Sequence, residues 1–324
     1  MGTFIARRTL WTLLVLFGIS VLVFLLFFSI PGIDPAAAMA GRNPDPQTIR
    51  AIRHSFGLDR PLPVQYLLMM KHLFVARDLQ SYTNRGIKVI PEITAAAPVT
   101  LSLVAGAVVL WVVFSITIGL VAAVFRGTPI DRTLMILSLL GVATPVFLLG
   151  EAVNIVTQSR FHDSVLFRWV PPLGYTPLTQ DPLLWFKHLL IPWVVLASAQ
   201  FIGLYARILR SSLVDVMHED YVRTARAKGL SERRVLTRHV LRTSMISYVS
   251  LFGLDLGALL GGGVVLVEVV FALPGIGFLT FQAASGLDLP VIMATIMYGA
   301  FFIVLANLLV DIGYTWLDPR IRPA

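Results

Sequence analysis

The sequence predicts an all-α integral membrane protein with six transmembrane helices and a partly helical extracytoplasmic insert between the first two. Of its 324 residues, 56% are hydrophobic and only 14% are charged, whereas soluble domains are about 25% charged. Six segments also reach the roughly 20 largely apolar residues that a helix needs to cross a bilayer. Because these segments share one bilayer, we expect a single membrane domain.

The predicted parts follow one another along the chain. The six spans are residues 10–30, 99–125, 133–156, 188–209, 245–271 and 291–316. The other parts are a cytoplasmic N-terminal segment (1–9), the extracytoplasmic insert (31–98), a cytoplasmic loop (210–244) inside the five-helix core (99–316), and a cytoplasmic tail (317–324).

The positive charges predict which side of the membrane each loop faces. Arg7 and Arg8 precede the first span, nine Lys or Arg lie between residues 207 and 242, and the short loop 272–290 holds none. Lys and Arg favour the cytoplasmic side in short loops, while long translocated segments such as the insert escape this bias. Both termini are therefore expected in the cytoplasm. The first apolar run is longer than that of a cleavable signal peptide, which favours an uncleaved signal anchor.

The sequence lacks the residues or motifs that several function classes require. The chain has no cysteine, which excludes disulfides and thiolate metal ligands. Its net charge of +8 is spread over span ends, which disfavours nucleic-acid binding. No Gly-x-x-x-x-Gly-Lys-[Ser/Thr] loop is present to hold ATP phosphates. We therefore predict no catalytic residues, no metal site and no cofactor on this chain.

The insert is predicted to be partly helical. Residues 45–56 and 65–75 read as short helices, with Gly57 ending the first. Pro61 and Pro63 are expected to keep the chain extended between them. The insert is either a cap on the outer face or a docking surface for a soluble partner, and the cap is favoured because ordered loops outnumber docking sites.

Residues 219–242 form a strongly charged segment between two apolar spans. Tyr221, Ala225 and Lys228 share one helical stripe, and Gly229 provides a natural helix stop. Ser231 can cap a second helix. The pattern predicts a helix, a glycine hinge and a second helix beneath the membrane. A basic loop resting on anionic lipid explains the charge but not the spacing of the small residues.

Within this segment, the run DYVRTARAKGLS at 220–231 resembles the EAA loop of ABC importer permeases, in the version of the dipeptide, oligopeptide and nickel branch. The runs FGLDRPLPVQY and GGGVVLVEVVFALPGIG are similar to that branch's outer insert and fifth span. The sequence departs from the branch within 32–35 and 77–81, both in the outer insert. Only Ala225 agrees with the generic Glu-Ala-Ala, so Arg223 is not expected to act as an acid.

The resemblance implies a type I ABC importer permease fold in a bacterial or archaeal cytoplasmic membrane. It implies an oligopeptide or dipeptide permease subunit of the B type, which forms half of a translocation pathway. The implied partners are a second homologous permease, usually a different chain, two ATP-binding subunits that use ATP and Mg, and an extracytoplasmic solute-binding protein. Contact with the ATPase is implied for Tyr221, Thr224, Ala225, Arg226, Ala227, Lys228 and Gly229. For Arg226 and Lys228, ion pairs with lipid headgroups are an equal alternative.

Polar side chains inside spans are functional candidates. They are Glu151, Asn154, Gln200, Asp255, Glu268 and Asn307. Asp255, Gln200 and Glu151 are predicted to line the translocation path, with Asp255 the first choice because nearby glycines allow close packing beside a cavity. The alternative for Asp255 is an interhelical hydrogen bond. Glu268, near a span end, reads as an anchor.

Two other function classes and a second substrate class stay open. An intramembrane enzyme would need converging catalytic groups, but His162, Asp163 and Ser164 are consecutive and do not point together. A stand-alone secondary transporter would predict repeated halves, and no repeat is evident. Peptides are the expected substrate, with nickel chelates or other solutes as the alternative within the same branch.

Overall fold

The computed structural model describes residues 2–28, 36–37, 45–55, 57–84 and 86–317. Within these residues every regular element is a helix, which confirms the all-α class. Five of the described helices are long and apolar enough to cross a membrane, and one sharply bent pair can form a sixth span. The end of the predicted first span and nearly all of the predicted C-terminal tail lie outside the described residues.

The long helices account for the predicted spans. They are α1 (Gly2–Phe28), α5 (Val89–Val124), the bent pair α6 (Pro129–Ala143) and α7 (Val146–Asn154), α8 (Pro182–Leu196) with α9 (Gly203–Val216), α12 (Leu241–Ala258) and α15 (Leu289–Leu317). Short helices are α3 (Pro46–Ser55), α4 (Leu62–Met70), α10 (Asp220–Ala227), α11 (Glu232–Val235), α13 (Val265–Val270) and α14 (Ile276–Gly286). Wider π-helical segments join or extend them at η1 (Lys71–Ala76), η2 (Ile155–Arg160), η3 (Ala197–Ile202), η4 (Leu236–Val240) and η5 (Leu259–Gly263).

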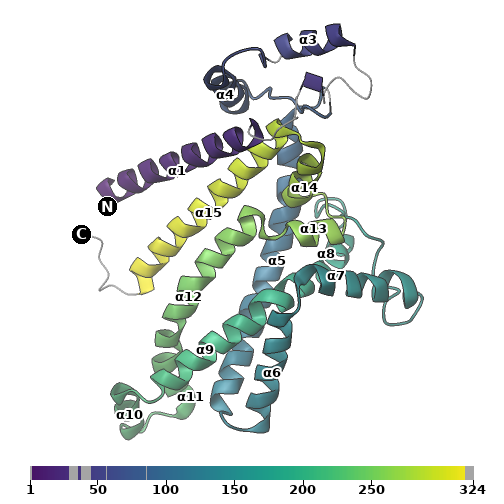
Figure 1. Cartoon of the computed structure of the whole chain (residues 1–324). Coiled ribbons are helices and arrows are strands. Elements are labelled where there is room, and N and C mark those ends of the chain that lie inside the picture. The colour runs from purple at the N-terminus through teal and green to yellow at the C-terminus, as the bar shows by residue number, and fades with distance from the viewer. Residues whose placement is uncertain (1, 29–35, 38–44, 56, 85, 318–324) are drawn as a thin grey trace.

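The helices are arranged around α9, which packs against both α5 and α12 (Figure 1). Helix α15 packs on α12, and α1 packs on α15 at the periphery. The insert helices α3 and α4 lie at one end of the molecule, while α10 and α11 lie at the opposite end. The insert helices and the charged α10–α11 segment are therefore separated by the length of the spans.

An aromatic cluster forms the centre of the core. The indole of Trp111 is fully buried and stacks on Phe201 at 4.4 Å between ring centroids, with Tyr205 edge-on at 4.6 Å. Aromatic pairs in these geometries stabilise a core by about 0.5–1.5 kcal/mol beyond the area that they bury. The cluster fixes α5 against α9 and the segment η3 before it.

The third predicted span, 133–156, is bent by 94° between α6 and α7. Helix α6 ends at Ala143 because Thr144 takes an extended conformation (φ −93°, ψ 117°) before Pro145. A residue that precedes proline is disfavoured in the helical region. Hydropathy alone could not show this bend, because both arms are apolar.

The fourth and fifth predicted spans also differ in extent. Helix α8 begins at Pro182, where the Asp181 carboxylate accepts hydrogen bonds from the Leu183 and Leu184 amides at 2.9 and 3.0 Å, a standard N-cap. The fifth span breaks at Gly262, whose φ of 132° is inaccessible to most residues. The predicted loop 272–290 is largely the helix α14.

Two findings concern the insert. Helix α3 lies where the first insert helix was predicted, but Pro61 and Pro63 do not keep the chain extended. Instead Pro61 is the N-cap of α4 and Pro63 sits in its first turn, where a missing amide hydrogen costs nothing. The loop after η1 is tied to the membrane body by Asp288, which accepts hydrogen bonds from the Ser81 hydroxyl and from the Tyr82 and Thr83 amides.

Candidate functional site

The predicted contact segment at 219–242 has the predicted shape. Helix α10 ends at Ala227, Gly229 follows with φ at 72°, and α11 begins at Glu232. Glycine adopts this left-handed conformation without a Cβ clash, so the chain reverses direction within a few residues. The π-helical segment η4 then joins α11 to α12 as one continuous helix.

Helix α10 has two distinct faces. Val222 and Ala225 are buried, at 0% and 6% exposure, and pack into the main core. Six of the seven predicted contact residues are exposed: Tyr221, Thr224, Arg226, Ala227, Lys228 and Gly229. Ala225 differs from these six, because its side chain packs into this chain's own core and fastens α10 to it.

Side-chain contacts hold the turn together. The Arg226 guanidinium forms an ion pair with Glu232 at 2.8 Å, which joins α10 to α11. The Tyr221 hydroxyl donates to Thr243 Oγ1 at 3.2 Å, which joins α10 to α12. Ser231 occupies the N-cap position of α11, but its side chain makes no capping hydrogen bond. The turn is therefore held in one shape by three elements.

A hollow of 330 Å³ lies beside α10, facing the ends of α5 and α9. Three arginines are among its lining residues: Arg126, Arg223 and Arg226. A concave surface with this charge favours an acidic partner side chain. The hollow and the exposed face of α10 together form one arginine- and lysine-rich surface.

An ion pair connects this region to the bent span. Arg210 of α9 binds Asp131 of α6 through two hydrogen bonds of 2.6 Å, from Nε and from Nη2. Asp131 is buried and also accepts from the Gly127 amide at 2.9 Å. Nearby, the backbones of α6 and α9 touch, since a Cβ on Gly203 would collide with the Ser138 carbonyl. The ion pair and the backbone contact together fix α6 against α9.

The predicted path residues lie in different surroundings. Asp255 on α12 is half-buried and accepts a hydrogen bond of 2.6 Å from the Tyr205 hydroxyl on α9. Gln200, in η3, and Glu151, on α7, are exposed. The structure therefore shows an interhelical hydrogen bond for Asp255 and does not bring the three side chains together by any contact among the described residues.

Sequence reasoning missed a buried polar network around Glu268. The Glu268 carboxylate is fully buried and accepts from the Thr100 hydroxyl at 2.6 Å and from the Phe278 amide at 2.9 Å. Thr100 in turn accepts from the Ile276 amide at 2.8 Å. The turn glycines are required here, because a Cβ on Gly275 would collide with the carboxylate. The anchor predicted for Glu268 is thus an internal junction of α5, α13 and α14.

Among the described residues, no group of three or more His, Cys, Asp or Glu side chains could hold a metal ion. The arrangement contains instead a membrane-spanning helical body, a basic surface on a helix pair at one end and a tied insert at the other. These features define a multi-pass α-helical membrane protein.

Comparison with known proteins identifies the family. Residues 115–323 match the model of the binding-protein-dependent transport system inner membrane component, and residues 1–104 match the model of its N-terminal region. A relative from Brucella abortus, named as a peptide transport system permease protein, is 39% identical over 322 residues, covering 99% of both chains.

Two further relatives match over equal lengths. One from Sinorhizobium fredii, named as a peptide ABC transporter permease protein, is 36% identical over 322 residues, or 99% of this chain and 100% of its own. The glutathione transport system permease protein GsiC of Salmonella choleraesuis is 37% identical over 322 residues, or 99% of both chains. The chain belongs to the binding-protein-dependent transport system inner membrane component family and is an ABC importer permease.

Proposed function

We propose that this chain is a B-type permease subunit that forms half of the pathway by which an ABC importer takes up oligopeptides or dipeptides. Support comes from relatives whose names specify peptides and glutathione and which match nearly the whole length of this chain. Both termini and α10 face the cytoplasm, and the insert faces outward. The distribution of Lys and Arg supports this orientation.

The exposed face of α10 contacts an ATP-binding subunit. The observation that carries this assignment is the two-faced geometry: Val222 and Ala225 are locked into the core, while Thr224 and Lys228 are exposed. A helix that is fixed on one side transmits a push on its other side as rigid-body motion. ATP and Mg bind to two separate ATPase subunits, since this chain has no phosphate-binding loop.

Motion at α10 reaches the spans through α9. The Asp131–Arg210 pair and the close contact between α6 and α9 pass it to the bent span, where the break before Pro145 separates the two arms. Alternating access requires one set of helices to rock against another. We propose that the α6–α9 unit is the moving part.

The remaining subunits complete the pathway. A second, homologous permease, expected to be a different chain, supplies the other half, and a solute-binding protein delivers the peptide to the insert side. Asp255, Gln200 and Glu151 are proposed to line the path, in which a carboxylate can meet a peptide ammonium group. Glu151 and Gln200 are exposed on the isolated chain, as path residues must be before the second permease packs on.

Affinity purification from native membranes in mild detergent tests this proposal. We expect a second permease and an ATPase to co-purify, and Thr224→Cys to crosslink to the ATPase. Ser164→Cys, on a connecting segment far from α10, is the control and should not crosslink to it. Recovery of this chain alone, with no ATPase activity even after crosslinking, would contradict the proposal.

A further inference from the structure

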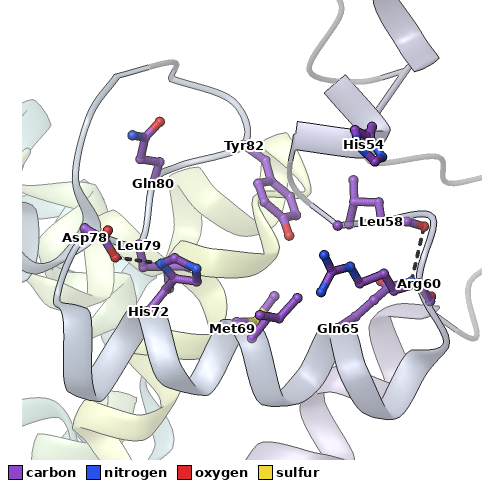
Figure 2. Close-up of a pocket in the computed structure, with 12 residues that line it drawn as sticks. His54, Leu58, Arg60, Gln65, Met69, His72, Asp78, Leu79, Gln80 and Tyr82 are labelled. Carbon is purple, nitrogen blue, oxygen red and sulfur yellow. Dashed lines mark hydrogen bonds and ion pairs between the residues drawn. The ribbon is translucent and has the colours of Figure 1, made fainter. Parts of the chain in front are cut away.

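The insert contains a pocket that the transport function does not require. It has a volume of 420 Å³, lies between the turn after α3 and the helix formed by α4 and η1, and includes residues of the loop 78–82 in its wall (Figure 2). Sites for small molecules usually measure about 300–1,000 Å³ and combine apolar walls with a few polar groups. Leu58, Leu68, Met69 and Leu79 supply the apolar wall here.

Some charged side chains at the pocket have a partner in this chain, and one does not. His54 binds Asp59 at 2.9 Å, and His72 binds Asp78 at 2.7 Å, each through Nδ1. These two acidic groups are therefore already engaged. The Arg60 guanidinium forms no ion pair within 4.0 Å with any of the described residues, so its N–H groups are available to a ligand.

The Arg60 side chain points into the pocket. In Figure 2 the Arg60 side chain extends over the helix floor, and the Tyr82 hydroxyl points into the same space. Gly57 turns the chain before Arg60 with φ at 66°, a left-handed conformation that favours glycine, and a Cβ there would crowd Leu68 Cδ1 at 3.2 Å. The Gln65 amide donates to the Arg60 carbonyl at 2.7 Å and fixes the turn beneath the side chain.

We infer that this pocket binds the terminal carboxylate of a small peptide, with Arg60 as the carboxylate-binding residue. Arginine matches a carboxylate with two parallel hydrogen bonds, and the leucine and methionine side chains can cover the neighbouring aliphatic part of the ligand. The inference deepens the proposed peptide import by adding a peptide site outside the membrane path. It can be tested on the isolated chain, so it does not depend on the proposed ATPase contact.

Calorimetric titration of the full purified chain with trialanine tests the site. We expect binding to weaken about ten- to hundred-fold when trialanine amide replaces the free acid, and equally in Arg60→Gln, because a charged hydrogen-bonded partner is lost. Arg60→Lys should restore only part of the affinity, since lysine lacks the planar fork. Lys71→Gln, which removes a nearby positive charge outside the pocket, is the matched control.

Amide hydrogen exchange locates the bound peptide. Trialanine should slow exchange at 57–60 and 78–82 in the wild-type chain and not in Arg60→Gln. Equal affinity for the acid and the amide, or protection confined to the spans, would overturn the inference. So would a result in which trialanine does not bind, while Arg60→Gln weakens the association with a solute-binding protein; Arg60 would then be a protein-docking contact.

Discussion

Glu268 shows how one buried carboxylate can organise three helices. Its two oxygens satisfy a hydroxyl on α5 and a backbone amide on α14, and both donors would otherwise be buried without partners. A buried donor that loses its acceptor costs about 1–3 kcal/mol. Thr100 lies 168 residues away in the sequence, so no local pattern could have revealed this pairing.

The first prediction concerns that junction. Glu268→Gln should lower the free energy of unfolding by about 1–3 kcal/mol, because the amide NH₂ of glutamine cannot accept from the Phe278 amide. Thermal unfolding of the purified protein in detergent measures the loss. Glu151→Gln makes the same chemical change at an exposed site and should leave the midpoint unchanged. Equal midpoints for both variants would contradict the assigned network.

The second prediction concerns the Asp131–Arg210 pair. In a double-mutant cycle with Asp131→Asn and Arg210→Gln, we expect a coupling free energy of about 1–3 kcal/mol, because Asp131 is buried and the contact is bidentate. The exposed pair of Asp220 and Arg223, 3.6 Å apart, is the control and should give at most about 0.5 kcal/mol. Coupling of that small size at Asp131 would remove the proposed link between α6 and α9.

Single residues were the hardest feature to predict from the sequence. The spacing of three and four placed Tyr221 and Ala225 on one stripe, but only the packing of α10 shows that Ala225 is buried and Tyr221 exposed. Small residues suit both a close partner and a close core. Their size alone could not distinguish the two.

At the scale of elements, the turn at Gly229 rests on backbone conformation alone. No atom of the described residues lies within 4 Å of the position that a Cβ would occupy, yet φ is 72°. Substitution is therefore opposed by the left-handed backbone and not by crowding. A substitution at Gly229 therefore tests the backbone conformation of the turn without adding a steric clash.

The third prediction concerns the backbone conformation at Gly229. Gly229→Asn should be mild, because asparagine tolerates the left-handed region, while Gly229→Val should cost about 1–2 kcal/mol locally. We expect ATP-driven uptake to fall in the valine variant and to persist in the asparagine variant, with both inserted normally. Uptake assays and hydrogen exchange in α10 measure the two effects. Normal uptake by Gly229→Val would show that the turn is not needed in this form.

The fourth prediction concerns the insert. Hydrogen bonds from His54 and His72 lower the pKa of Asp59 and of Asp78 below the ordinary value of 3.8. A lowered folded-state pKa stabilises the fold above the unfolded value, and this contribution is lost as the pH falls through the folded pKa. Because both carboxylates are exposed, we expect a modest increase in local opening of the insert below about pH 4.

Hydrogen exchange at 54–78, corrected for its intrinsic pH dependence, measures this opening. In the double variant Asp59→Asn and Asp78→Asn, the acid-induced step should disappear, whereas Asp45→Asn should retain it. A step of unchanged size in the double variant would assign the opening to other groups.

Most elements could be predicted because apolar length is a strong signal. The exceptions have local causes: Thr144 before Pro145 bends a span, Gly262 breaks one, and Pro61 begins a helix that was expected to be extended. A proline either ends or begins a helix according to which turn it occupies. The sequence alone does not show which turn of a helix a given proline will occupy.

At the scale of the whole molecule, the α10–α11 turn and the insert lie at opposite ends of the spans (Figure 1). A push on one end can reach the other only through long, rigid helices. Helix α5 provides such a connection, because Val89 at its start packs with Leu73 and Tyr82 of the insert, and Ala123 near its end belongs to the core cluster that holds Val222 and Ala225 of α10.

The fifth prediction tests the orientation of the two ends. The chain has no cysteine, so a single introduced thiol reports its own location. Lys228→Cys should react with a membrane-impermeant maleimide only after the membrane is opened, whereas Lys71→Cys should react on the intact inner membrane. The reverse pattern would place α10 outside and overturn the proposed topology.

The hydrogen bonds at Asp288 also set the order of assembly. Its partners Ser81, Tyr82 and Thr83 leave the ribosome more than 200 residues earlier, since the pairs are 207, 206 and 205 residues apart. At about 5–20 residues per second, that separation lasts about 10–40 seconds. During this interval the loop 81–83 lacks its carboxylate acceptor, so these hydrogen bonds form only when Asp288, at the start of the last span, has been made. A chain truncated before residue 288 would therefore leave the Ser81 hydroxyl and the Tyr82 and Thr83 amides without this acceptor.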